Sequence, residues 1–336
     1  MAVSGSPLDI GLIGLGAWAR AAYVPILQER SDVKVRAVAA RTEETRSHAA
    51  GLLGADVALY ADYSELLRHA PVDAVMVGLP SETTAAVCIA ALETGKHVWF
   101  EPPLADTDET GRLLDLADRS ELVFHADLEL RYLPVIGALR EIFAQGELGR
   151  PLLVRVELEN GWARERALDD VSPESMAGTL STWYVDLMDA IFEKPTRRVD
   201  LYGSRPRHES VVEVGTAAVE YSDEAFGEWA FNLRSGEDLA LRIKVAGTEG
   251  EAEADLLTGA YRHRVRDSEW VSAAADCSRP VHGFVGMRES VEAFLSAVRG
   301  QGRTKSGADV YRRVHAIQMA LQRSEAEGTP IGGSTG

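Results

Sequence analysis

The hydrophobic residues of the first third of the chain fall into short unbroken runs, separated by longer segments with helical spacing. The runs predict buried strands at 8–13, 33–39, 74–78, 97–100 and 122–126. The segments between them predict helices at 43–53, 82–94 and 107–119, with Thr42, Ser81 and Thr107 at their starts. Because strands that alternate with helices form a parallel sheet, we expect an α/β, doubly wound domain at 7–126.

After residue 126 the hydrophobic pattern changes to a period of two. The alternating positions are Val154, Val156, Leu158, Val212, Val214, Ala217, Val219, Tyr221, Trp229, Phe231, Leu233, Leu239, Leu241, Ile243 and Val245. Helical segments are predicted at 134–145, 173–192, 287–298 and 308–325. We therefore expect a second α/β domain at 127–327 with a largely antiparallel, open sheet. The Gly/Thr/Ser-rich tail at 328–336 is expected to be disordered.

A glycine-rich turn follows the first predicted strand. Gly14, Gly16 and Ala19 form the pattern G-x-G-x-x-A, which is typical of dinucleotide binding. The first glycine permits the tight turn, the second lets the backbone approach a pyrophosphate, and the small third residue lets the helix pack closely on the strand. The alternative is a tight strand–helix turn without a ligand. With a ligand, Ala17 and Trp18 would lie beside the phosphates.

The ends of the other predicted strands supply the remaining cofactor contacts. Ligands of doubly wound sheets bind at the carboxyl ends of the strands, which places Leu79, Pro80, Glu101 and Pro102 on one rim. The second strand is followed by Ala40, Arg41 and Thr42 rather than by an acidic residue. Arg41, assisted by the Thr42 hydroxyl, would suit a 2′-phosphate, so we favour NADP over NAD. In the competing interpretation Arg41 is a surface residue paired with Glu43 or Glu44.

Composition narrows the function classes. The chain has 336 residues with a net charge of −17, which argues against nucleic acid and anionic membranes as partners. No apolar run is as long as a membrane span, and the N-terminus lacks a signal-peptide pattern, so we expect a cytoplasmic protein. Cys88 and Cys277 do not form a disulfide framework, and we expect no metal site.

Further motifs carry a family resemblance. They are the fingerprint at Gly14, Gly16 and Ala19, the run Asp73–Pro80, Gly95–Val98, Glu101–Leu104, Arg131 with Pro134, and Gly146 with Gly149. With these motifs the chain resembles the glucose-fructose oxidoreductase/inositol dehydrogenase (Gfo/Idh/MocA) family over nearly its whole length. The resemblance implies an NAD(P)-dependent oxidoreductase with a Rossmann domain and a C-terminal α/β domain. It also implies a small-molecule substrate, such as a sugar or cyclitol, and association through the open sheet.

The chain departs from the family pattern at the expected catalytic positions. Where the family usually has Glu-Lys-Pro, this chain has Glu101-Pro102-Pro103, and proline carries neither a charge nor a backbone donor. Thr84 stands where the family often has histidine. In the motif Asp-x-Gly-x-His-x-x-Asp, Thr182 replaces the first aspartate and Asp186 replaces the histidine, while Asp189 is kept.

The remaining polar residues give a different candidate set. Asp186, Tyr184 and Glu101 are the catalytic candidates, and their ordinary alternatives are a helix-surface carboxylate, a packed tyrosine and a strand-end carboxylate. Residues 182, 186 and 189 share one helix face. The candidate substrate-binding residues are Arg131, Thr182, Asp186 and Asp189. His125 and Glu129 lie near the domain junction, where a hydrogen-bonded structural histidine is the commoner case.

Two function classes follow. The first is an NADP-dependent oxidoreductase with a non-standard catalytic set. With Glu101, Asp186 and Asp189 near the nicotinamide, the local field is expected to be negative, which suits an imine or amino-bearing substrate. The alternative is a redox-neutral enzyme or a non-catalytic binding protein on the same fold. Because the alternating strands are expected to leave apolar residues on the open face of the sheet, we also expect a homodimer or homotetramer.

Overall fold

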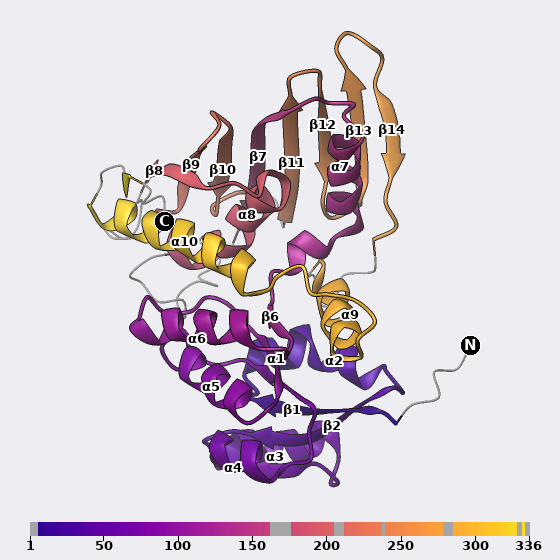
Figure 1. The fold of residues 1–336 in the computed structure, drawn as a ribbon, viewed down its shortest axis with the longest axis vertical. Helices are drawn as coiled ribbons and strands as arrows, with labels where there is room; N and C mark the ends of the chain where they lie inside the picture. Colours follow the sequence, from indigo (N-terminus) through magenta and orange to yellow (C-terminus); the bar gives the residue numbers. More distant parts are fainter. Residues whose placement is uncertain are drawn as a thin grey trace. The chain divides into compact units, whose positions relative to one another are not determined.

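The computed structural model of the protein describes residues 6–161, 176–204, 212–236, 239–277, 285–327 and 331–332 (Figure 1). The chain forms two compact units. Unit 1 comprises residues 1–127 and 279–312, and unit 2 comprises 128–278 and 313–336. None of the helices described in these ranges is long and apolar enough to cross a bilayer.

Unit 1 contains a six-stranded parallel sheet. In spatial order its strands are β3 (Ala58–Tyr60), β2 (Val33–Ala39), β1 (Leu8–Ile13), β4 (Ala74–Val77), β5 (His97–Phe100) and β6 (Phe124–Ala126). The five predicted strands are confirmed, and the short edge strand β3 is an addition. The order reverses between β1 and β4, and the crevice at such a switch point is where doubly wound folds bind their ligands.

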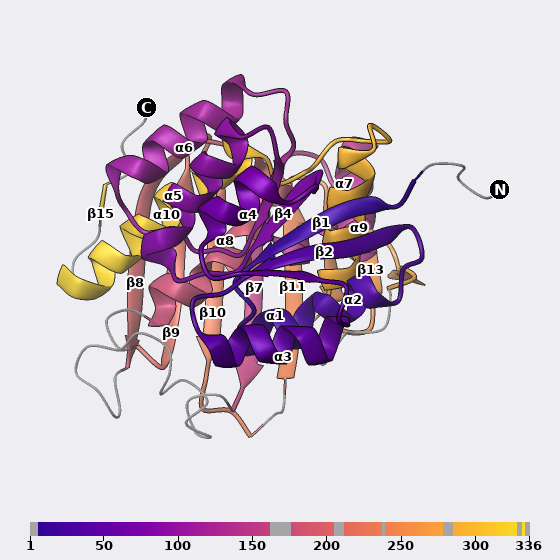
Figure 2. The ribbon, with the colours of Figure 1, turned by 90° about the horizontal axis from the view of Figure 1, so that it is seen from below.

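Helices cover both faces of this sheet. They are α1 (Ala17–Ala22), α2 (Val24–Gln28), α3 (Glu43–Leu53), α4 (Tyr63–His69), α5 (Ser81–Glu93) and α6 (Asp108–Arg119). In Figure 2, α1 and α3 lie on one side of the strands, and α5 and α6 lie on the other. Thr42 and Thr107 cap their helices as predicted, whereas the cap of α5 is Pro80 and Ser81 is its first residue.

One helix from late in the sequence belongs to unit 1, and this corrects the predicted domain boundary. Helix α9 (Met287–Val298) buries Met287, Val291, Phe294 and Leu295 in the same core as β1 and α2. The predicted scheme had assigned everything from 127 to 327 to the second domain. The apolar stripe of α9 fits the face of the parallel sheet beside α1 and α2, so burial of that stripe decides where the helix belongs.

Unit 2 is built on a nine-stranded sheet. In spatial order its strands are β14 (Val271–Ala274), β13 (Ala260–Val265), β12 (Gly250–Asp255), β11 (Leu239–Gly247), β7 (Pro151–Asn160), β10 (Phe226–Asn232), β9 (Val214–Tyr221), β8 (Thr196–Ser204) and β15 (Ile331–Gly332). The neighbours are antiparallel except β7 and β10, which confirms a largely antiparallel sheet. β15 lies in the tail that was expected to be disordered. The expectation is wrong for these two residues, because Ile331 pairs with Val199 of β8. The rest of that tail lies outside the described residues.

The helical elements of unit 2 are η1 (Glu129–Tyr132), α7 (Pro134–Ala144), α8 (Met176–Phe192) and the part of α10 (Ala308–Glu327) from Arg313 onward. Helix α8 packs against β7 and β10, where Val156 and Trp229 are buried. The alternate positions on the sheet carry exposed apolar side chains in part, namely Tyr202, Val214 and Phe226. They also carry partly exposed cross-strand ion pairs, which are Arg155–Glu228, Lys244–Glu251 and Arg262–Glu253.

Candidate functional site

A cavity of about 570 Å³ lies at the carboxyl ends of β1, β2 and β4 in unit 1. Gly14 forms the tight turn with φ of +87°, and a Cβ there would lie 2.1 Å from the Gly78 carbonyl oxygen. Gly16 faces open space, so a ligand can approach its backbone closely. The glycine pattern therefore has the geometry that a dinucleotide requires, with glycine enforced at position 14.

The cavity is lined by one arginine, Arg41, and by one carboxylate, Asp62, which accepts from the Ser64 backbone N–H as the cap of α4. Arg41 is exposed, and its guanidinium forms no hydrogen bond or ion pair within the part of the chain that the structure describes. Arg46 donates to the carbonyl oxygens of Ala40 and Arg41 at 2.7 and 2.8 Å. Arg46 therefore fixes the backbone that carries Arg41. It also pairs with Glu43, one of the two acidic residues considered as partners of Arg41.

Of the ten residues predicted to contact the cofactor, six line this cavity. They are Gly14, Gly16, Arg41, Thr42, Leu79 and Pro80, while Ala17, Trp18, Glu101 and Pro102 are not among the lining residues. Thr42 acts as the N-cap of α3, accepting from the Thr45 backbone N–H at 3.2 Å. The Trp18 indole N–H hydrogen-bonds to the Glu101 carboxylate, which connects the start of α1 to the end of β5.

Two carboxyl groups meet beyond the ends of β5 and β6. Glu101 follows β5, Asp127 follows β6, and their side chains are hydrogen-bonded to each other. Burial raises the pKa of Asp127 to about 7. Burial, followed by the charge of Asp127, raises the pKa of Glu101 well above its usual range. The next residue, Pro102, is buried and supplies no compensating charge.

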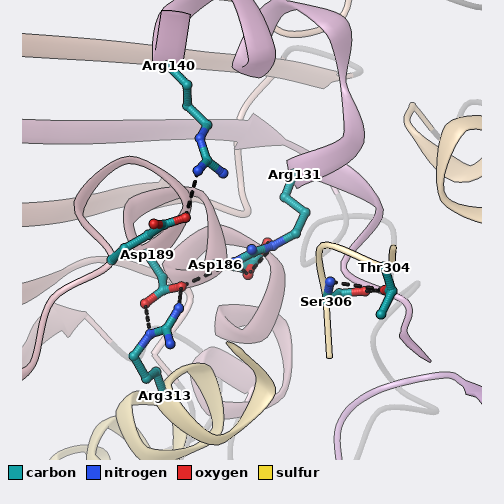
Figure 3. A network of polar contacts seen from close by, with 8 residues as sticks. Arg131, Arg140, Asp186, Asp189, Thr304, Ser306 and Arg313 are labelled. Carbon is teal, nitrogen blue, oxygen red and sulfur yellow. Dashed lines mark hydrogen bonds and ion pairs between the residues drawn. The ribbon is translucent and has the colours of Figure 1, made fainter. Parts of the chain in front are cut away.

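In unit 2, three of the four predicted substrate residues, Arg131, Asp186 and Asp189, belong to a buried ion-pair network (Figure 3). The Arg131 guanidinium on η1 donates hydrogen bonds to the Asp186 carboxylate of α8 from Nε, at 2.9 and 3.0 Å, and from Nη2. Asp189, one turn further along α8, lies 3.2 Å from Arg131 Nη2 and accepts two hydrogen bonds from Arg313 of α10, at 2.7 and 2.9 Å. Both aspartates are fully buried.

This network changes the expected electrostatics. Burial raises the pKa of Asp186 to about 6, and the charge of Arg131 opposes that rise. Above that pH, two aspartates face two arginines, so the cluster is close to neutral. The expectation of a negative field at Asp186 and Asp189 is therefore wrong for unit 2, because Arg131 and Arg313 balance the two charges.

The two other candidates on α8 have different surroundings. Tyr184 is buried and stacks on Trp229 with ring centroids 4.9 Å apart, and burial followed by the charge of Glu129 raises its pKa. Thr182 is fully buried, and its hydroxyl has no hydrogen-bond partner among the described residues. The helix thus brings 182, 186 and 189 to one buried region, as their spacing predicted.

Sequence reasoning missed several residues of these sites. The missed residues are Arg46, Asp127, Ser290 and Arg313. Arg46 acts through a backbone carbonyl, and the other three act through side-chain contacts between elements far apart in the sequence. Only Arg46 had a local signal, since it follows the predicted helix start at Thr42 by four residues.

Comparison with known proteins agrees with both units. Residues 8–128 match the description "Oxidoreductase family, NAD-binding Rossmann fold", and residues 136–253 match the Gfo/Idh/MocA C-terminal domain. The chain belongs to the Gfo/Idh/MocA family of oxidoreductases. Membership accounts for the pairing of a nucleotide-binding Rossmann unit with a unit built on an open, largely antiparallel sheet.

Several Gfo/Idh/MocA relatives are similar in sequence. Inositol 2-dehydrogenase 1 of Saccharopolyspora erythraea is 25% identical over 96% of this chain and 95% of its own length. An uncharacterised oxidoreductase of Rhizobium meliloti is 33% identical over 41% of this chain and 42% of its own length. The match to the Rhizobium protein therefore spans less than half of that protein.

Solved structures of this family share the fold. The scyllo-inositol dehydrogenase of Lactobacillus casei with bound NAD(H) and scyllo-inositol has a TM-score of 0.80 at 18% identity, covering 97% of this chain and 99% of that one. Levoglucosan dehydrogenase in complex with NADH and levoglucosan also has a TM-score of 0.80 at 18% identity, covering 98% and 100%. At these identities the likeness establishes the fold.

We expect Arg131→Met to destabilise the protein by roughly 3–5 kcal/mol, because it leaves two buried aspartates with one arginine. The matched control is Arg140→Ala, which removes an exposed pair with Glu193 in the same unit and is expected to cost at most about 1 kcal/mol. Urea unfolding measures both changes. Equal losses for the two variants would show that the buried network is not a stabilising element.

Proposed function

We propose that the protein is an oxidoreductase that prefers NADP to NAD and transfers hydride to or from a small polar metabolite. The observation that carries this proposal is the cavity at the ends of β1, β2 and β4, with enforced glycine at one end and an available arginine at the other. A bound nicotinamide cofactor would supply or accept the hydride, and the chain must supply its binding and the proton chemistry.

The preference for NADP follows from the residues at the end of β2. A 2′-phosphate needs a cation that is not already paired, and Arg41 meets this condition. The interpretation in which Arg41 pairs with Glu43 is weakened, because Glu43 is held by Arg46. Thr42 already serves as a helix cap, so Arg41 is the main determinant in this proposal.

Arg41→Ala is expected to weaken NADPH binding by about 1.5–3 kcal/mol, the range for a charge-assisted hydrogen bond, with little effect on NADH binding. Calorimetric titration of each cofactor measures the preference. Arg68→Ala, which removes an exposed arginine of α4 paired with Glu65, is the control and should leave both affinities unchanged. Equal affinity of the wild-type protein for the two cofactors would contradict the proposal.

The unit 2 network is close to neutral and leaves no cation free for the substrate, which favours a substrate that carries its own positive charge. A carbonyl that gains hydride becomes an alkoxide and needs a cation or a proton donor. Both arginines of the unit 2 network already face aspartates, and Pro102 provides no charge after Glu101. An iminium ion becomes a neutral amine on gaining hydride, so an imine or amino-bearing substrate suits these residues better than a simple keto sugar. Asp186, Tyr184 and Glu101 remain the proposed catalytic set, with Arg131, Thr182 and Asp189 at the substrate.

We expect Asp186→Asn to lower kcat/KM for an amino-bearing substrate by about tenfold or more, equivalent to about 1.4 kcal/mol, while NADPH affinity is unchanged. The control Asp223→Asn alters a partly exposed carboxylate paired with Lys194. NADPH oxidation with matched imine and ketone substrates gives the readout. Faster reduction of the neutral ketone, or full activity of Asp186→Asn, would overturn the substrate assignment. NADPH binding without oxidation by either class would favour the redox-neutral or non-catalytic alternative.

The proposal includes a homodimer or homotetramer formed through the open face of the sheet in unit 2. Cross-strand pairs of both signs on that face, such as Lys244–Glu251, allow a self-complementary contact about a twofold axis. Sedimentation at micromolar concentration is expected to give at least the dimer mass, with dissociation favoured by salt. A monomer at low salt would contradict this assembly.

A further inference from the structure

A chain of hydrogen bonds leads away from the buried carboxyl pair of unit 1. Ser290 Oγ on α9 donates to Asp127 Oδ1 at 2.5 Å and lies 3.0 Å from His125 Nε2. His125 Nδ1 lies 2.9 Å from Thr304 Oγ1. The chain therefore runs from Glu101 through Asp127, Ser290 and His125 to Thr304. Figure 3 shows Thr304 beside Ser306, whose backbone N–H donates to the Thr304 hydroxyl oxygen at 3.2 Å.

The donors in this chain can be assigned a single direction. A carboxylate only accepts, so the Ser290 hydroxyl proton points to Asp127. Ser290 Oγ then accepts from His125 Nε2–H, and the neutral ring accepts at Nδ1 from the Thr304 hydroxyl. Every donor therefore points toward the carboxyl pair. Asp127, Ser290 and His125 are fully buried, whereas Thr304 is partly exposed, so the chain connects the interior to the surface.

A second observation marks the same region. Tyr23, between α1 and α2, is fully buried, and its hydroxyl has no partner among the residues that the structure describes. That hydroxyl lies against Gly78, at 2.7 Å from the position a Cβ would take, and the charges of Glu101 and Asp127 raise its pKa further than burial alone. A buried hydroxyl without a partner is costly, which favours a polar ligand atom or water beside the ends of β4 and β5.

We propose that Glu101 and Asp127 share one proton and that Thr304, His125 and Ser290 return it from solvent, making this pair the acid–base group of the reaction. The inference rests on the proposed function. Two adjacent carboxyl groups can form a hydrogen bond only if one of them holds a proton. Glu101 Oε2 is buried and has no hydrogen-bond partner among the described residues, so it is available to a ligand atom.

The proton balance is simple. In the reductive direction the hydride would come from the bound cofactor and convert the iminium to a neutral amine. An O–H bond of the Glu101 carboxyl then breaks and an N–H bond forms on that amine, which leaves as the ammonium ion. The carboxylate that remains then takes a proton through Asp127, Ser290 and His125, and Thr304 takes one from water. The side chains neither gain nor lose electrons. In the oxidative direction the same steps run backwards.

The groups that face the pair determine where it titrates. Trp18 of α1 donates to Glu101, Ser290 of α9 donates to Asp127, and both interactions favour ionisation. Tyr23 stays neutral, because burial raises its pKa. For Asp127, burial outweighs the hydrogen bonds from Ser290 and Glu101, so its pKa is about 7. Glu289 precedes Ser290 on α9, and its Oε2 is also buried.

Infrared spectroscopy of the protein without cofactor tests the shared proton. We expect the carbonyl band of one carboxyl to disappear with a midpoint near pH 7, where Asp127 ionises. The band of the Glu101 carboxyl, which then holds the proton beside Asp127, should persist above that pH. Asp127→Asn should abolish the step near pH 7 and Glu101→Gln should abolish the persisting band, whereas Glu93→Gln, on the exposed surface of α5, should leave both unchanged. Titration of all carboxyl groups in the ordinary acid range, or an unchanged band in both variants, would overturn the proposal.

Time-resolved infrared after a pH jump tests the relay. Ser290→Ala is expected to slow reprotonation by about a hundredfold, the lower end of what a positioned proton donor contributes. Ser290→Thr keeps the hydroxyl and should retain the rate, which separates proton transfer from packing. If Ser290→Ala reprotonates as fast as the wild-type protein, the relay is wrong.

These readouts separate the inference from the proposed function, since neither requires cofactor or substrate. A titrating carboxyl pair in a protein that never oxidises NADPH would refute the function while keeping the pair. Conversely, turnover by Glu101→Gln with the wild-type pH profile would refute the acid–base role and leave the oxidoreductase assignment standing.

Discussion

A carboxylate removed from water needs a cation, several hydrogen-bond donors or a proton, and this requirement organises both units. Unit 2 meets this requirement with cations, since Arg131 forms an ion pair with Asp186 and Arg313 forms one with Asp189. Unit 1 places the half-buried Glu101 beside the fully buried Asp127, with donors from Trp18 and Ser290. With two carboxyl groups so close, the remaining option is to keep a proton between them. The first arrangement is rigid and nearly neutral, whereas the second can exchange a proton.

Both arrangements also hold distant parts of the sequence together. Arg131 and Asp186 are 55 residues apart, and Arg313 and Asp189 are 124 apart, so the network fixes η1, α8 and α10 within unit 2. In unit 1, Ser290 lies 163 residues from Asp127 and brings α9 to the end of β6. The same helix buries Phe294 in the core, so its apolar stripe positions the serine for its contact. Fold and candidate chemistry therefore depend on the same packing.

The sequence predicted what local patterns encode. Strand runs, helix caps and the glycine turn are read over a few residues, and they predicted the parallel sheet and the nucleotide cavity at Gly14 and Gly16. Period-two alternation predicted the strands around Val156 and Trp229. It could not predict that the opposite face would carry ion pairs beside its exposed apolar residues, because cross-strand partners depend on register.

Long-range partners were beyond local reasoning. The spacing of Thr182, Asp186 and Asp189 predicted a shared helix face, but no pattern identified Arg131 and Arg313 as their counter-ions. Because these counter-ions were not identified, the sequence predicted a negative site around Asp186 and Asp189. Likewise, His125 was read as a hydrogen-bonded structural residue; it does form hydrogen bonds on both nitrogens, and only the structure shows that they lead from Thr304 to Asp127.

Neutron diffraction from deuterium-exchanged crystals grown at about pH 8, above the pKa of about 7 for Asp127, tests the central claim most directly. The account predicts one deuterium between the carboxyl groups of Glu101 and Asp127 and one on Nε2 of His125, with Nδ1 bare. Two bare carboxylates, or a deuterium on Nδ1 in place of Nε2, would contradict it.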